Sequence, residues 1–229
     1  MTSYHESMVA VVPAREFDEH MPGKNLLPLN NTNLLVHKIR QLKKVFNTRD
    51  IFVSSESRKY LNFATEEGVF ADLRPTELAG PMANFGDFVH HIASNLECEH
   101  ILWASPTSPL VDEKDFALAV DLYFKVLNQG YDSLITSNKI KRFLLDENGP
   151  LNFRFNIKDR SNTKLPVLYE FVNGIVIAPR KSMLKWRYNW GFIPFKMQLP
   201  PHKIVDICNQ AEYRFANFLV SHASSVNTP

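Results

Sequence analysis

The stretch VAVVPAREFDEHMPGKN, residues 9–25, decides the fold class that we expect for this chain. It begins with the apolar run 9–12, which predicts a buried strand. The run ends at Pro13, and the loop that follows starts at Arg15 and ends at Lys24. Ligands of parallel sheets bind beyond the carboxyl ends of the strands, where fixed cations hold anionic groups. The stretch therefore predicts a central parallel strand that opens into a binding loop.

Short apolar runs alternate with longer amphipathic segments along the rest of the chain. Strands are predicted over residues 50–55, 69–73, 100–105, 132–136 and 173–179. Helices are predicted over residues 33–46, 58–68, 85–99, 112–130 and 209–223. This alternation predicts an α/β fold with a Rossmann-like, mostly parallel sheet and helices on both faces. We expect a single domain over residues 1–229.

The alternation fails over about residues 138–171. The Asn-Gly turn signal at 148–149 and the alternating segment LNFRFNI (151–157) predict a β-hairpin insertion that leaves the main sheet. Its apolar side chains need a surface to bury against, and a second copy of the chain can provide one. We therefore expect the insertion to form a homodimer interface.

The composition excludes several classes of function. A chain of 229 residues with 45% hydrophobic content can bury a sizeable core, and a net charge of +2 gives no basis for a nucleic-acid partner. No uncharged apolar run approaches membrane-spanning length, and the N-terminus lacks the pattern of a signal peptide. Two cysteines, Cys98 and Cys208, do not make a disulfide framework, so we expect a protein of the reducing cytoplasm.

Several short motifs give the chain a resemblance to a known family. They are VVPAR, PGKN, VSSES, LRPTELAG, PTSPL, LPVLYEFVNG and VDIC, spread from about residue 8 to residue 219. Their order resembles that of the acylneuraminate (sialic acid) cytidylyltransferases, and the ordered set is far more specific than any one motif. The resemblance implies a fold of the nucleotide-diphospho-sugar transferase type.

The resemblance also implies a reaction. CMP is transferred from CTP to the anomeric hydroxyl of a sialic acid-like nonulosonic (2-keto) sugar acid, and pyrophosphate is released. Such CMP-sugars serve the biosynthesis of cell-surface polysaccharides. The implied partners are CTP, a small acidic sugar and a second copy of the chain, and the implied cofactor is Mg²⁺ or Mn²⁺.

Roles for particular residues follow from the same resemblance. The implied catalytic residues are Arg15, Lys24 and Asp206, with Asp206 as the metal ligand. The implied nucleotide-binding residues are Ala14, Arg15, Lys24, Asn25, Arg74, Ala83 and Asn84. The implied substrate-binding residues are Ser105, Tyr169, Asn173, Gly174 and Phe192. An aspartate before a helix is equally compatible with a capping role, so that alternative stays open for Asp206.

The chain departs from the family's pattern at several positions, and two of these departures bear most on activity. The usual flexible Gly-Gly-Ser-Lys-Arg loop is replaced by the acidic segment EFDEH, residues 16–20, which predicts weaker binding of a triphosphate. The second aspartate of the metal motif is Cys208, a poor Mg²⁺ ligand that is interpreted as a buried thiol. Two alternatives therefore stand beside the sialic acid-like cytidylyltransferase. One is a nucleotidyltransferase for a different sugar acceptor, and the other is a catalytically altered or inactive homologue that acts as a nucleotide- or sugar-binding module.

Overall fold

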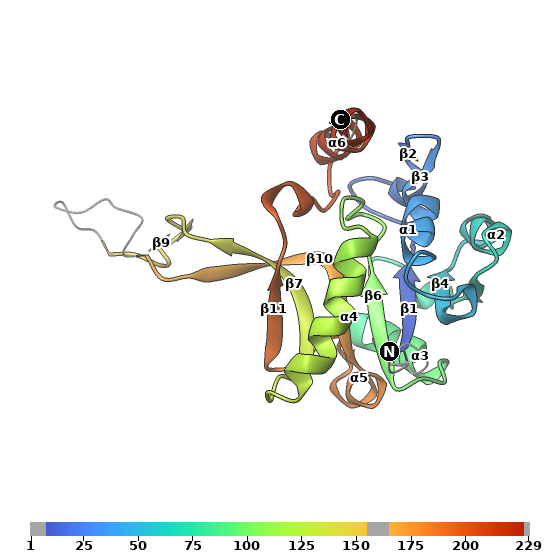
Figure 1. Ribbon diagram of the computed structural model, residues 1–229, viewed down its shortest axis with the longest axis horizontal. Helices are drawn as coiled ribbons and strands as arrows, with labels where there is room; N and C mark the ends of the chain where they lie inside the picture. The colour runs from blue at the N-terminus through green and yellow to red at the C-terminus, as the bar shows by residue number, and fades with distance from the viewer. Residues whose placement is uncertain (1–7, 155–164, 227–229) are drawn as a thin grey trace.

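The computed structural model describes residues 8–154 and 165–226, and a seven-stranded sheet forms its centre (Figure 1). The strand order is β11-β7-β10-β6-β1-β4-β5. The strands are β1 (Met8–Pro13), β4 (Ile51–Ser55), β5 (Phe70–Leu73), β6 (His100–Ala104), β7 (Ser133–Ile140), β10 (Leu168–Pro179) and β11 (Pro194–Gln198).

The sheet is mostly parallel, as the sequence predicts. Strand β1 pairs in parallel with β4 and β6, β4 with β5, and β7 with β11. Strand β10 is antiparallel to both of its neighbours, β6 and β7. The reversal follows from connectivity, because β7 returns into β10 without the crossover that a parallel pair requires.

Helices cover both faces of the sheet. Helices α1 (Leu34–Leu42), α2 (Arg58–Glu66) and α4 (Glu113–Leu127) pack on one face, and α3 (Phe85–Ser94) and α5 (Arg180–Trp186) pack on the other. Figure 1 shows α4 in front of the strands and α3 and α5 behind them. Residues of β1 alternate between the two cores, since Ala10 and Val12 join the first and Val11 joins the second.

A third, smaller core lies beyond the carboxyl ends of the parallel strands. It joins the short hairpin β2 (Pro28–Leu29) and β3 (Thr32–Asn33) to helix α6 (Gln210–Val226) through Leu29, Leu34, Ile207 and Ala216. Figure 1 shows α6 and this hairpin at the edge where β1 ends. These elements border the region where the ligand site is expected.

The predicted insertion corresponds to an arm that projects from the body of the molecule (Figure 1). It contains the outer parts of β7 and β10 and the hairpin β8 (Leu145–Asp146) and β9 (Gly149–Pro150), which turns at the predicted Asn-Gly. The strand expected over 151–157 is wrong in its described part, because residues 151–154 are irregular, and the remainder lies outside the described residues. A role for the arm in dimerisation remains a prediction.

Several elements were not predicted from the sequence, among them the short hairpin β2–β3. Helix α5 and strand β11 follow β10, and neither carries a clear apolar period. Within the described ranges, no helix has both the length and the apolar character needed to cross a membrane.

Candidate active site

A cavity of about 390 Å³ lies beyond the carboxyl ends of β1, β5 and β6. Its lining includes eight of the residues that the sequence implicated: Arg15, Lys24, Asn25, Arg74, Ala83, Asn84, Ser105 and Asn173. They come from segments far apart in the chain, and the parallel sheet brings them to one edge.

The loop that follows β1 closes on itself beside the cavity. Gly23 adopts φ +73°, a left-handed conformation that favours glycine, and leads into the 3-10 turn Lys24–Leu26. The buried Asn25 side chain donates from Nδ2 to the Arg15 carbonyl oxygen at 2.8 Å. The two ends of the loop are thereby fastened together, and Arg15 and Lys24 both face the cavity.

Asp18, in the middle of that loop, lies between the two cations. Its Oδ2 is 2.8 Å from Lys24 Nζ and 3.4 Å from Arg15 Nη2. Burial alone would raise the pKa of the Asp18 carboxyl, but hydrogen bonds from Lys24, Met21 and His20 hold that pKa at about 2. The carboxylate is therefore ionised near neutral pH and compensates the charge of both cations.

Arg74 supplies the third cation of the cavity. Its guanidinium is buried, donates from Nη2 to Glu56 Oε2 at 2.8 Å and lies over the Phe88 ring at 4.6 Å. Glu56 Oε1 also accepts from the backbone N–H of Glu16 at 2.7 Å. Glu56, which follows β4, therefore connects Arg74 to the start of the first loop.

The turn after β6 carries a chain of hydroxyl groups to Asp206. Ser105 Oγ lies 2.7 Å from Thr107 Oγ1, which donates to Asp206 Oδ1. The Ile207 N–H donates to the Thr107 carbonyl oxygen at 2.8 Å, and Ser108 Oγ donates to the Asn173 carbonyl oxygen at 3.0 Å. Burial raises the pKa of the Asp206 carboxyl. Asp206 is thus held by the Thr107 hydroxyl and by the backbone bond of the next residue, in a place where its negative charge is poorly solvated.

The capping alternative for Asp206 is wrong. The residue that caps α6 is Asn209, whose Oδ1 accepts from the backbone N–H groups of Ala211 and Glu212 at 3.0 Å each. The interpretation of Cys208 as a buried thiol is also wrong, because its side chain is exposed. Partial desolvation of the sulfur and the nearby Asp206 charge raise the pKa of the thiol, so Cys208 is not a thiolate near neutral pH.

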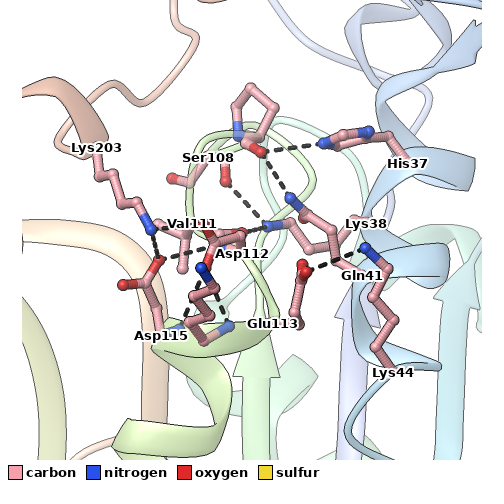
Figure 2. Close-up of polar contacts among 12 residues, drawn as sticks. His37, Lys38, Gln41, Lys44, Ser108, Val111, Asp112, Glu113, Asp115 and Lys203 are labelled. Carbon is pink, nitrogen blue, oxygen red and sulfur yellow. Dashed lines mark hydrogen bonds and ion pairs between the residues drawn. The ribbon is translucent and has the colours of Figure 1, made fainter. Parts of the chain in front are cut away.

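Two lysines hold the turn after β6 and the start of α4 from opposite sides (Figure 2). Lys38, fully buried in α1, donates to the carbonyl oxygens of Ser108 at 3.0 Å and Val111 at 2.8 Å. Lys203 lies 2.6 Å from Oδ2 of both Asp112 and Asp115, the residues that form the capping box of α4. Because Lys203 precedes Asp206 by three residues, it fastens the segment that carries Asp206 to the start of α4.

A second cavity, also of about 390 Å³, adjoins the first. It shares Phe85, Asn173 and Asn189 with the first cavity. Its other lining residues are Phe171, Tyr188, Trp190 and Asp206. Asn173 therefore lies where a ligand in the second cavity would meet a ligand in the first, and Asp206 of the second cavity is bonded to Thr107 of the first.

Four predicted residues line neither cavity, whereas Asp206 lines only the second. Ala14 is buried and donates from its N–H to the Ser54 carbonyl oxygen at 3.0 Å. Gly174 lies against the turn after β6, since a Cβ there would be 2.9 Å from Val111 Cγ2. Tyr169 lies on the arm and Phe192 is 87% exposed, and neither lines the second cavity. Their role in binding the substrate remains a prediction.

The residues of the site that were not predicted individually include Glu56, Thr107 and Asn189. Glu56 follows β4, a strand end that the VSSES motif marks, and Thr107 lies in the PTSPL motif. Asn189 lies in neither motif; it is 6% exposed, lines both cavities, and its Oδ1 has no hydrogen-bond partner among the described residues. No pattern in the sequence distinguishes it.

Comparisons with known proteins agree with this geometry. A family model described as cytidylyltransferase matches residues 9–150. The chain is 26% identical to an N-acylneuraminate cytidylyltransferase of Escherichia coli O18:K1:H7 over 213 residues, which are 91% of this chain and 51% of that protein. A second relative is the pseudaminic acid cytidylyltransferase and UDP-2,4-diacetamido-2,4,6-trideoxy-beta-L-altropyranose hydrolase of Helicobacter pylori. The two chains are 24% identical over 220 residues, which are 91% of this chain and 41% of that protein. The chain thus spans about half or less of the length of these relatives.

A likeness to a solved structure supports the same fold. The structure of CMP:2-keto-3-deoxy-manno-octonic acid synthetase complexed with CTP aligns with a TM-score of 0.66 at 13% identity. The alignment covers 95% of this chain and 99% of that chain. At this identity the likeness shows that the two chains share a fold.

Proposed function

The chain belongs to the cytidylyltransferase family, and from this premise we propose that it transfers CMP from CTP to a sialic acid-like 2-keto sugar acid. The observation that carries the proposal is the pair of adjoining cavities. One contains the cations Arg15, Lys24 and Arg74, and the other has aromatic walls and meets the first at Asn173. This arrangement suits a nucleotide and an acceptor that react where the cavities meet.

The reaction breaks one bond and forms another at the α-phosphorus. The anomeric hydroxyl oxygen of the sugar attacks phosphorus, loses its proton, and the bond to the β-phosphate oxygen breaks to release pyrophosphate. Little covalent chemistry falls to the protein in such a transfer, so positioning and charge neutralisation provide most of the catalysis. Arg15 and Lys24 would neutralise the phosphates, and Arg74 would complete the cationic wall.

The donor set at Asp206 fits a metal that arrives with the nucleotide. In the described ranges, no three or more His, Cys, Asp or Glu side chains gather as a metal site. Mg²⁺ is often held by one or two carboxylates together with substrate phosphates and water. Asp206, whose buried charge a cation would compensate, would hold Mg²⁺ or Mn²⁺, which neutralises phosphate oxygens when bound.

The projecting arm supports a homodimer. It exposes several large apolar side chains: Phe143, Leu145, Leu151, Val167, Tyr169 and Phe171. Burial of such a surface favours association. We expect light scattering at micromolar concentration to give the mass of a dimer, and a clean monomer would contradict this. The free Cys98 and Cys208 agree with a cytoplasmic protein.

The single test of function is a pyrophosphate-release assay with each nucleoside triphosphate against a panel of nonulosonic acids. We expect release with CTP and at least one 2-keto sugar acid, and little with the other triphosphates. Release that depends on another class of sugar would support the nucleotidyltransferase with a different acceptor.

One observation favours a second candidate, a nucleotide- or sugar-binding module without turnover. Asp18 already pairs with both Arg15 and Lys24, and Cys208 stands beside Asp206 where the family has a second carboxylate. Binding of CTP without pyrophosphate release for any acceptor would favour this candidate.

A further inference from the structure

The cations of the first cavity are each paired with a carboxylate of the chain itself. Asp18 pairs with Arg15 and Lys24, and Glu56 pairs with Arg74. A triphosphate needs the same cations, so it has to compete with these carboxylates. The two carboxylates differ in how they are held.

Asp18 divides its two oxygens between the loop and the cations. Oδ1 accepts from the backbone N–H groups of His20 at 3.1 Å and Met21 at 3.0 Å. Oδ2 faces only Arg15 and Lys24 among the partners that the described residues provide. The side chain is 6% exposed, so the carboxylate fills its position between the cations instead of extending into water.

This arrangement is the one that a bound phosphate group adopts. Backbone N–H groups and two basic side chains converge on a single anionic group. Asp18 belongs to the same loop as both cations, so a movement of the loop can take the carboxylate away. Glu56 instead follows β4 and holds the start of the loop through the Glu16 N–H, so it is part of the frame.

We propose that Asp18 is a built-in substitute for a phosphate group, which a polyphosphate must displace from Arg15 and Lys24. Asp18 thereby determines how strongly the affinity of the cavity depends on the negative charge of its ligand. The inference rests on the proposed function for the identity of the nucleotide, but the anion position itself can be tested with inorganic polyphosphate.

The variant Asp18→Asn separates the two parts of this side chain. Asparagine keeps an oxygen for the His20 and Met21 N–H groups and removes the charge from the side that faces the cations. Glu19→Gln is the matched control, because it removes one negative charge from the next residue of the same loop, where the side chain is exposed. The affinities of each variant for tripolyphosphate, CTP and CMP are measured by titration calorimetry at constant, low salt.

We expect Asp18→Asn to bind tripolyphosphate and CTP at least about tenfold more tightly than the unmodified chain. The gain for CMP should be smaller, because CMP carries less charge, and Glu19→Gln should change each affinity by less than about twofold. Unchanged or weaker binding of tripolyphosphate by Asp18→Asn would overturn the proposal. An equal gain in Glu19→Gln, or an equal gain for CMP and CTP, would overturn it too.

Failure of the proposed function looks different. If Asp18→Asn gains affinity for tripolyphosphate while CTP binds no better than other triphosphates, the anion position stands and the cytidylyltransferase assignment fails. Thermal melts establish that the variants are folded, and Asp18→Ser, whose hydroxyl can also accept from the turn, is a second variant. If neither variant folds at 25 °C, the carboxylate is required for the fold, and a displaceable role is excluded.

Discussion

Two lysine–aspartate clusters lie on either side of the site, and they serve different purposes. In the loop after β1, Lys24 and Arg15 line the cavity. Asp18 pairs with both of them and would compete with an anionic ligand for their charge. In the turn after β6, Lys38 and Lys203 line neither cavity, and they bond to oxygens of the turn and of the start of α4 (Figure 2). The same chemical groups thus occupy the proposed anion position in the first cluster. In the second cluster they attach the segment that carries Asp206 to the start of α4.

Access to the ligand decides what an ion pair does. A carboxylate whose cations face a cavity can be exchanged for a phosphate, whereas one buried against a helix start cannot be exchanged without loss of structure.

The largest effect is expected at Asp206. We expect Asp206→Asn to lower turnover at least about 100-fold, because it removes the charge that would hold the metal. The melting temperature should move little, since asparagine keeps the shape of the side chain. Pyrophosphate release and a thermal melt measure the two effects.

The capping residue Asn209 provides the opposite control. We expect Asn209→Ala to cost about 1 kcal/mol of stability through loss of the cap on α6, with turnover largely retained. If Asp206→Asn retained its activity, a role for Asp206 as a metal ligand in the reaction would be excluded.

A smaller effect on turnover is expected at Lys203. We expect Lys203→Met to lower kcat about tenfold with the KM for CTP nearly unchanged, because the segment before Asp206 loses its attachment to α4. Lys44→Met is the matched control, since exposed Lys44 also pairs with the first turn of α4, at 3.1 Å from Glu113. Equal losses of kcat in the two variants would show that Lys203 does not act through Asp206.

Buried Lys38 should make the free energy of unfolding depend on pH. Burial lowers the pKa of its ammonium to about 7, against the effects of Asp115 and Asp112, whereas the unfolded chain keeps a pKa near 10.5. Between these values the unfolded state binds more protons, so the contribution of Lys38 to the free energy of unfolding rises with pH from about 7 to about 10.5. Urea denaturation should show this rise, and Lys38→Met should lack it. If the free energy of unfolding changed with pH in the same way in both proteins, the lowered pKa of Lys38 would be contradicted.

The smallest effect is expected for Asp18 in acid. Its folded pKa of about 2 lies below the ordinary value of 3.8, so its contribution to stability is complete above 3.8 and is lost as the pH falls toward 2. We expect the free energy of unfolding to fall less over this window in Asp18→Asn than in the unmodified chain. Urea denaturation between pH 4 and pH 2 measures the difference, and identical slopes would show that Asp18 is not ion-paired in solution.

The sequence was sufficient to predict the framework because the framework follows from local patterns. The apolar run before Pro13, the alternation of strands and helices, and the Asn-Gly turn all have direct structural meaning. Strand β11 lacked such a pattern, because it lies at the edge of the sheet with most of its side chains partly exposed.

The ion pairs of the site could not be predicted, because they depend on contacts between distant segments. From the sequence alone, Asp18 is one more negative charge that would repel a triphosphate. In the structure, the N–H groups of His20 and Met21 orient its carboxylate toward Arg15 and Lys24. Lysine is rarely buried, so the helical pattern around Lys38 gave no reason to expect a fully buried ammonium. Asp206 and Asn209 both suit a helix start, and their roles are separated by their contacts: Asn209 accepts from the first N–H groups of α6, whereas Asp206 accepts from Thr107.

The most direct test of the central claim is a crystal structure of the chain with CTP bound and no acceptor present. We expect the triphosphate between Arg15 and Lys24, with the Asp18 carboxylate displaced from both, and the bonds of Lys38 and Lys203 unchanged. A triphosphate bound elsewhere, or one bound while Asp18 still pairs with Lys24, would contradict the distinction between the two clusters.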